Sequence, residues 1–151
     1  MLIKFKKLDE RAIIPEYKTT GSAGFDLQVL IDSKKETLKK GEIKLFKTGL
    51  AMALPNGYEA QVRSRSGLSL KNGIIVLNAP GTVDSDYRGE IGIIAMNCGN
   101  EDFTVENGMR LAQMVIAKYE KTDIEVVDNL DETERNSGGF GSTGIKWIEK
   151  G

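Results

Sequence analysis

Apolar and polar residues alternate over short stretches of this chain, and turn-forming residues separate many of these stretches. An alternation with a period of two residues is typical of β-strands that bury one face. It predicts strands at residues 2–8, 43–54, 58–62, 74–77, 92–97, 110–119 and 124–127. Residues 66–71 have a weak helical pattern and are too few to form a stable helix alone. The pattern therefore predicts an all-β fold, either a barrel or a sandwich.

The composition of the chain changes near Asp128. The length of 151 residues fits one domain, and such a chain buries roughly 68–70% of its unfolded surface. After Asp128, an acidic and polar run leads into a glycine-rich tail. We therefore predict a β-barrel domain at residues 1–128 and a mobile C-terminal arm at residues 129–151.

The charge balance gives no general reason for this protein to bind nucleic acid. Lysine and arginine total 21 residues, aspartate and glutamate total 22, and the pI is about 5.6. The sequence has neither an apolar span of about 20 residues nor a secretion signal. Its single cysteine, Cys98, cannot form an internal disulfide. We expect a cytoplasmic protein that contacts neither nucleic acid nor a membrane.

The absence of histidine restricts the chemistry that the chain can perform. Without an imidazole, the chain can form neither a Ser-His-Asp triad nor a Cys-His pair, and it cannot assemble a His/Cys zinc site. A general base must then be a carboxylate, a lysine, a tyrosine or a thiolate. A metal ion would be a hard cation bound by oxygen atoms, either from carboxylates or from substrate phosphates.

Residues 81–90, with the sequence GTVDSDYRGE, lie between the predicted strands at 74–77 and 92–97. This arrangement predicts a hairpin whose tip carries three carboxylates, a tyrosine and an arginine. A solvated turn with local hydrogen bonds explains these residue types about as well as a reactive site. A carboxylate in this position is a reasonable base for activating water.

Two further segments contain groups that suit phosphate binding. In residues 63–71, arginines alternate with serines, and both side chains donate hydrogen bonds to phosphate, although an exposed basic strand fits equally well. The tail at 135–144, RNSGGFGSTG, combines Arg135 with hydroxyl groups and Phe140. Ile145 stands where a Walker-type loop would have lysine. Phe140 either fixes the arm onto the barrel or stacks on a base, and the nearby phosphate donors favour stacking.

Five short motifs occur along the chain in a fixed order: SAGFDL at 22–27, RSGLS at 65–69, GTVDSDYRGE at 81–90, GMRLAQ at 108–113 and RNSGGFGSTG at 135–144. Taken together they resemble the five motifs of the homotrimeric dUTPase family. The first and fourth motifs alone would be explained as a turn and a strand. Asn136 departs from the family pattern, which usually has glycine after the tail arginine.

The resemblance implies a jelly-roll-like β-barrel of the β-clip type that assembles into homotrimers. It implies three active sites at subunit boundaries, with each C-terminal arm closing over a neighbour's site. The implied reaction is hydrolysis of dUTP to dUMP and pyrophosphate, which keeps uracil out of DNA and supplies dUMP for thymidylate synthesis.

The resemblance also assigns roles to individual residues. Asp84 matches the catalytic aspartate that activates water for attack on the α-phosphorus, and Tyr87 matches the residue that packs on deoxyribose. The positions matched to uracil and sugar binding are Asn78, Thr82, Val83 and Gly92. Those matched to phosphate binding are Arg65, Ser66, Gly67 and Gln113. Those matched in the arm are Arg135, Phe140, Gly141 and Ser142.

The implied cofactor is Mg²⁺, held mainly by the substrate phosphates. Asp26 matches a position near the metal-bound water and would contact the ion through water at most. Arg110 is assigned a structural or inter-subunit role.

Two alternatives stay open at the level of sequence. The fold is shared with dCTP deaminase, although the aromatic glycine-rich arm and the DSDYRGE sequence look more like the hydrolase. A trimer with an added regulatory, protein-binding role is the second alternative. An intact Asp84 and a complete arm argue against loss of activity but not against a second role.

Overall fold

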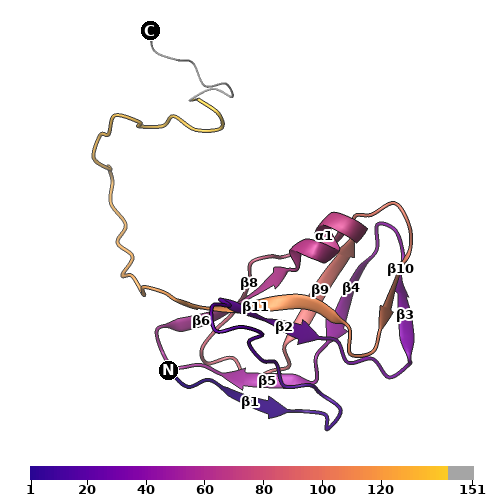
Figure 1. Cartoon of the computed structure of the whole chain (residues 1–151). Coiled ribbons are helices and arrows are strands. Elements are labelled where there is room, and N and C mark those ends of the chain that lie inside the picture. Colours follow the sequence, from indigo (N-terminus) through magenta and orange to yellow (C-terminus); the bar gives the residue numbers. More distant parts are fainter. Residues whose placement is uncertain (143–151) are drawn as a thin grey trace. The chain divides into compact units, whose positions relative to one another are not determined.

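The computed structural model describes residues 1–142, and Figure 1 shows the arrangement of their elements. These residues form eleven strands and one short helix. In chain order they are β1 (Lys4–Lys7), β2 (Gly24–Gln28), β3 (Lys35–Leu38), β4 (Ile43–Lys47), β5 (Leu50–Ala53), β6 (Tyr58–Ser64), α1 (Ser66–Asn72), β7 (Ile74–Val76), β8 (Gly81–Val83), β9 (Gly92–Asn97), β10 (Phe103–Glu106) and β11 (Arg110–Lys118). The predicted all-β fold is confirmed.

The strands pair in four antiparallel sheets, and most pairings join distant parts of the chain. The largest sheet has the order β2-β11-β6-β8, and a second sheet has the order β4-β9-β7. Two smaller sheets pair β1 with β5 and β3 with β10. The long strand β11 lies between β2 and β6, so the first and fourth motifs are neighbours in one sheet, and the second motif follows directly after β6.

Alternating side chains of these strands form one apolar core. In β2 the buried side chains are Phe25 and Leu27, and in β9 they include Ile93 and Ala95. Since successive residues of a strand point to opposite faces, β2 and β9 contribute every second side chain to this core, whereas Leu50, Ala51 and Met52 of β5 are all buried. The cavity residues and the group around Asp26 described below lie within residues 1–121, the unit that contains this core.

The predicted boundaries agree best where the alternation is strong. Strand β9 and the short helix α1 are confirmed, the helix with one residue more than predicted. The single strand predicted at 43–54 is wrong, because the chain turns at Thr48-Gly49 and forms β4 and β5 separately. Gly49 has φ +69°, a conformation that suits glycine, and this conformation ends β4.

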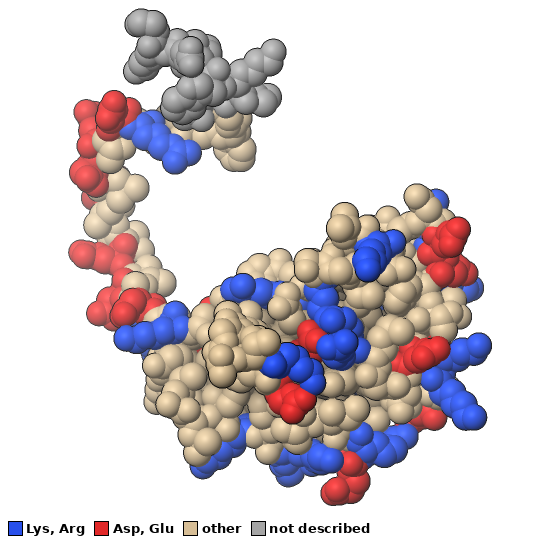
Figure 2. Space-filling view, in the orientation of Figure 1, with Lys and Arg blue, Asp and Glu red and all other residues tan. Residues whose placement is uncertain are grey.

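Residues 1–121 and residues 122–151 form two separate compact units. The strand predicted at 124–127 is wrong, because these residues are not in a strand. In the described part of the second unit, Ile124, Val126 and Leu130 are almost fully exposed. Figure 2 shows that this part of the chain is rich in acidic side chains. Thr143 and Gly144, which end the fifth motif, lie outside the described residues.

The charged side chains of the first unit are mixed in sign. On the face shown in Figure 2, lysine and arginine are interspersed with aspartate and glutamate. This agrees with the nearly neutral balance of the whole sequence. In the part of the chain that the structure describes, no helix has the length and apolar character needed to cross a membrane.

Candidate active site

The hairpin predicted from the third motif exists and encloses a cavity. Strands β7 and β9 pair with each other, while β8, which lies between them in sequence, pairs with β6 of another sheet. A cavity of about 310 Å³ lies where β8 departs from the β4-β9-β7 sheet. Its walls include all six residues that the sequence placed at the uracil, sugar and catalytic positions: Asn78, Thr82, Val83, Asp84, Tyr87 and Gly92.

Glycines leave room for the side chains that shape this cavity. A Cβ atom at Gly81 would lie 2.8 Å from Nδ2 of Asn78, and one at Gly92 would lie 2.7 Å from Cδ1 of Leu45. The remaining walls are mostly apolar, with Leu45, Val62, Ile91 and Ile94. The cavity therefore combines an apolar lining with a few polar groups, which is typical of a small-molecule site.

The tip of the hairpin is a turn held by its own backbone. The amide of Tyr87 donates to the carbonyl of Asp84 at 3.2 Å, and Arg88 donates to the carbonyls of Ser85 and Tyr87. Asp84 is exposed, and no hydrogen bond or ion pair engages its carboxylate among residues 1–142. Its oxygen atoms are thus available to accept a proton from water at the cavity wall.

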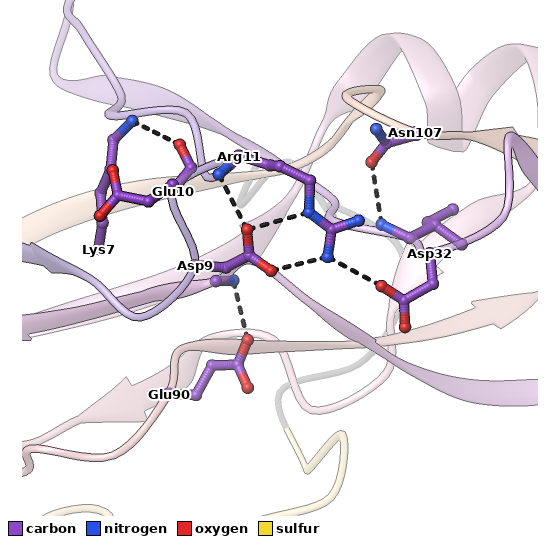
Figure 3. Close-up of polar contacts among 9 residues, drawn as sticks. Lys7, Asp9, Glu10, Arg11, Asp32, Glu90 and Asn107 are labelled. Carbon is purple, nitrogen blue, oxygen red and sulfur yellow. Dashed lines mark hydrogen bonds and ion pairs between the residues drawn. The ribbon is translucent and has the colours of Figure 1, made fainter.

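Glu90 anchors the other end of this turn, and sequence reasoning did not assign it a role. Its carbonyl accepts a hydrogen bond from the Tyr87 hydroxyl at 3.1 Å. Its carboxylate accepts the amide of Gly49 at 2.8 Å, and Figure 3 shows this contact. In the next residue, Ile91, the carbonyl accepts a hydrogen bond from the Thr48 hydroxyl, and the amide donates to the carbonyl of Leu50. The corner between β4 and β5 therefore holds Glu90 in place, and Glu90 accepts the hydrogen bond of the Tyr87 hydroxyl.

An ion-pair network lies beside this corner (Figure 3). Arg11 binds the carboxylate of Asp9 at 2.7 Å and that of Asp32 at 2.9 Å. The hydrogen bond from the Arg11 side chain lowers the pKa of Asp9 to about 2, so this carboxylate is ionised at neutral pH. Ala12, the next residue, lies so close to Gly49 that a Cβ atom there would meet its side chain at 2.9 Å. The network thus holds the segment that packs on the corner.

If Tyr87 packs on a deoxyribose, as the motif resemblance implies, replacing Glu90 with alanine is expected to weaken the discrimination between dUTP and UTP. The Gly49 amide then loses the carboxylate that accepts it, and the carbonyl of residue 90, which accepts the Tyr87 hydroxyl, is no longer held in place. We expect the ratio of kcat/KM for the two nucleotides to fall by roughly tenfold to a hundredfold. Glu90→Gln keeps an acceptor oxygen and should retain most of the discrimination.

Glu42→Ala is the matched control for this experiment. Glu42 also accepts a backbone amide through its carboxylate, that of Lys39 at 2.7 Å, but it does not line the cavity. This variant also removes a carboxylate that accepts a backbone amide, and it should keep the wild-type ratio. An unchanged ratio in Glu90→Ala would refute the positioning role of Glu90.

The phosphate-binding candidates form a second group, around Asp26. The Nε atom of Arg65 lies 2.9 Å from one Asp26 oxygen, and a guanidinium nitrogen of Arg110 lies 3.0 Å from the other. Arg65 also donates to the carbonyl of Arg110 at 2.8 Å. Two cations therefore meet at one carboxylate, and the structural or inter-subunit role of Arg110 stays a prediction.

Strand register brings Gln113 into the same group. Gln113 lies opposite Asp26 on β2 and Arg63 on β6, and its side chain donates to the carbonyl of Ser64 at 2.9 Å. Ser66 and Gly67 follow in the first turn of α1, where both are exposed. The structure thus gathers the candidates from the first, second and fourth motifs.

The described residues of the arm form local turns. Arg135 donates through Nε to the carbonyl of Gly138 at 2.8 Å, and the amide of Ser142 donates to Gly139. The ring of Phe140 is fully exposed. Asn136, which departs from the family pattern, has φ 42°, the left-handed region that glycine would also adopt. Its side chain accepts the amide of Thr133 at 3.0 Å, and this bond supports the conformation.

The structure joins the predicted residues into groups but does not join the groups to one another. No side-chain hydrogen bond or ion pair within residues 1–142 connects the cavity residues with those around Asp26. The same residues contain no cluster of three or more histidines, cysteines, aspartates or glutamates suited to a metal ion.

A sequence model of the dUTPase family matches residues 10–144, which is most of the chain. The chain belongs to the dUTPase family. Deoxyuridine 5'-triphosphate nucleotidohydrolase of Rickettsia felis is 55% identical over 144 residues, covering 95% of this chain and 97% of that protein. The enzyme of the same name from Treponema denticola is 57% identical over 141 residues, covering 93% and 97%.

Solved dUTPase structures have the same fold as this family member. The Staphylococcus bacteriophage 80alpha dUTPase with dUPNHPP matches with a TM-score of 0.86 at 26% identity, covering 95% of this chain and 99% of that one. A mutant dUTPase of Staphylococcus aureus phage phi11, described as coordinating a structural Mg(II) ion, matches with a TM-score of 0.77 and covers 87% of this chain. Its identity of 23% supports the shared fold alone.

Proposed function

We propose that this dUTPase-family chain hydrolyses dUTP to dUMP and pyrophosphate. The observation that carries the proposal is the cavity in which Asp84, Tyr87 and Asn78 lie together. Uracil would be bound by Asn78 and by the backbone of Thr82, Val83 and Gly92. The Tyr87 ring would pack on the deoxyribose and disfavour a 2′-hydroxyl group.

The proposed chemical step uses Asp84 as the general base. The carboxylate accepts a proton from a water molecule while the water oxygen forms a bond to the α-phosphorus. The bond between the α-phosphorus and the bridging oxygen breaks, and pyrophosphate leaves. Arg65, Ser66, Gly67 and Gln113 would donate to the phosphates as charge develops on them.

Magnesium fits this chain as an ion that arrives with the substrate. Both oxygens of Asp26 are occupied by the guanidinium groups of Arg65 and Arg110, and the described residues offer no metal-ligand cluster. Phosphate oxygens and water would hold Mg²⁺, which prefers such ligands, and Asp26 would contact it through water at most. The ion would neutralise phosphate charge during the reaction.

We further propose a homotrimer in which each active site is shared between chains. Membership of the dUTPase family, whose five motifs the chain carries in order, supports this assembly. In the arm, Phe140 would stack on uracil while Arg135, Gly141 and Ser142 bind the γ-phosphate, and closure of residues 129–151 would exclude water. A cytoplasmic location is consistent with the exposed, unpaired Cys98.

Incubation with dUTP and with dCTP tests the proposal. The expected result is release of pyrophosphate from dUTP and no release of ammonia from dCTP. Ammonia from dCTP, with dUTP left intact, would instead identify a deaminase of the same fold.

A further inference from the structure

The side chain of Tyr87 lies directly against the backbone of Gly89, two residues further along the hairpin. A Cβ atom at Gly89 would lie 2.5 Å from Cζ of Tyr87 and 2.9 Å from Cε2, and it would lie still closer to the hydroxyl oxygen. The three atoms nearest to this position all belong to the Tyr87 side chain. Position 89 therefore has no room for a side chain while Tyr87 keeps its place.

The backbone conformation of Gly89 gives no separate reason for a glycine. Six glycines among the described residues have a positive φ, and Gly89 is not one of them. A residue with a side chain can adopt a φ outside the left-handed region without strain. The contact with Tyr87 is thus the feature of the structure that requires glycine at this position.

Two contacts with the hairpin backbone hold the Tyr87 side chain. One is the fit against Gly89, and the other is the hydrogen bond from its hydroxyl to the carbonyl of Glu90 at 3.1 Å. Glu90 is itself bound to the amide of Gly49, as Figure 3 shows. Tyr87 is 46% exposed, and the aromatic pairs among residues 1–142 do not include it. The place of the ring therefore depends on the residues that follow it in the turn, not on burial in the core.

Gly89 lies outside the wall of the active-site cavity, whereas Tyr87 lines it together with Asp84. A change at Gly89 would reach a bound nucleotide through the Tyr87 ring. The position of such a ring matters, because a misplacement of about 1 Å in a positioning group can lower the rate about a hundredfold. The space left by Gly89 thus sets where the ring stands before a nucleotide arrives.

We infer that Gly89 is a positioning residue for Tyr87 and thereby determines the discrimination between deoxyribose and ribose. A side chain at position 89 occupies the volume of the ring, so Tyr87 turns away and loses its bond to Glu90. The turn itself is preserved, because the atoms that must move are at the far end of an exposed side chain. This inference rests on the proposed function, since it concerns the sugar on which Tyr87 is proposed to pack.

Gly89→Ala is the first test. The ratio of kcat/KM for dUTP to that for UTP should fall roughly tenfold to a hundredfold, because the ring no longer stands at the position of the sugar. Steady-state kinetics with both nucleotides measure this ratio. A Gly89→Ala protein with the wild-type ratio overturns the inference.

Gly21→Ala is the matched control, because Gly21 is exposed and a Cβ atom there meets nothing within 4 Å. This variant should keep the wild-type ratio. A double variant shows whether Gly89 acts through Tyr87. In a Tyr87→Leu protein the ring is already absent, so adding Gly89→Ala should change the remaining ratio by less than about twofold. A further large fall would show that Gly89 acts on another group and would overturn the inference.

Crystal structures of the wild type and of Gly89→Ala without nucleotide test the positioning role independently of activity. The wild type should keep the Tyr87 hydroxyl bonded to the Glu90 carbonyl, and the variant should lose this bond with the turn otherwise unchanged. A variant in which Tyr87 keeps its place overturns the inference. If the wild type does not hydrolyse dUTP, the proposed function is wrong, and the place of Tyr87 in the variant still decides whether Gly89 positions it.

Discussion

Replacing Asp84 with asparagine is expected to lower kcat for dUTP hydrolysis by about a hundred- to ten-thousand-fold. Asparagine has nearly the same size but cannot accept the proton of the attacking water. Because Asp84 is exposed at the tip of the hairpin, the fold should be unaffected. Pyrophosphate release under saturating dUTP measures the change, and KM should change much less than kcat.

Asp86→Asn provides the control for this prediction. Asp86 lies two residues further along the same turn, is also exposed and does not line the cavity. Its variant should retain the wild-type rate, which separates the loss of a base from the loss of a surface charge. An Asp84→Asn protein with unchanged turnover would contradict the assignment of Asp84 as the base.

Deleting the chain from Arg135 onward is expected to reduce turnover strongly while the assembly stays intact. The proposed arm supplies Phe140 for the base and Arg135 and Ser142 for the phosphates, so its loss leaves the site open to water. The single variant Phe140→Ala should lower kcat/KM for dUTP by about 5- to 150-fold, because stacking on a base contributes about 1–3 kcal/mol. Steady-state kinetics and light scattering of both variants measure these effects.

Leu130→Ala is the control for the aromatic substitution. Leu130 is 84% exposed in the same unit of the chain but outside the fifth motif, so its loss should leave the kinetics unchanged. If the deletion instead dissociated the trimer, the arm would have a structural role, and its proposed function as a lid would be wrong.

The fold could be predicted from sequence where local alternation coincides with burial. Residues 92–97 alternate strictly and form β9 as predicted. Strands β2, β3, β8 and β10 were missed. The short polar sequences KETL and FTVE, for example, become β3 and β10 by pairing with each other from distant positions. Residues 124–127 alternate but lie outside the strands of the described chain, since alternation does not provide a neighbouring strand.

The sequence predicted which residues line the cavity but not the contacts that hold the hairpin and the phosphate-binding candidates in place. The motif resemblance selected six residues that line one cavity, and the tip of the hairpin followed from the charged residues between two strands. The bond between Glu90 and Gly49 and the pairing of Arg110 with Asp26 were not predicted. Each joins residues more than 40 positions apart, and only the folded chain brings them together. A carboxylate just before the buried Ile91 was the available signal for Glu90.

Hydrolysis of dUTP in water enriched with oxygen-18 shows which phosphorus the water attacks. We expect attack on the α-phosphorus at the hairpin that carries Asp84. Mass spectrometry after a single turnover should therefore find the label in dUMP and none in pyrophosphate. Label in pyrophosphate would show attack at another phosphorus and would contradict the account, as would a protein that leaves dUTP intact.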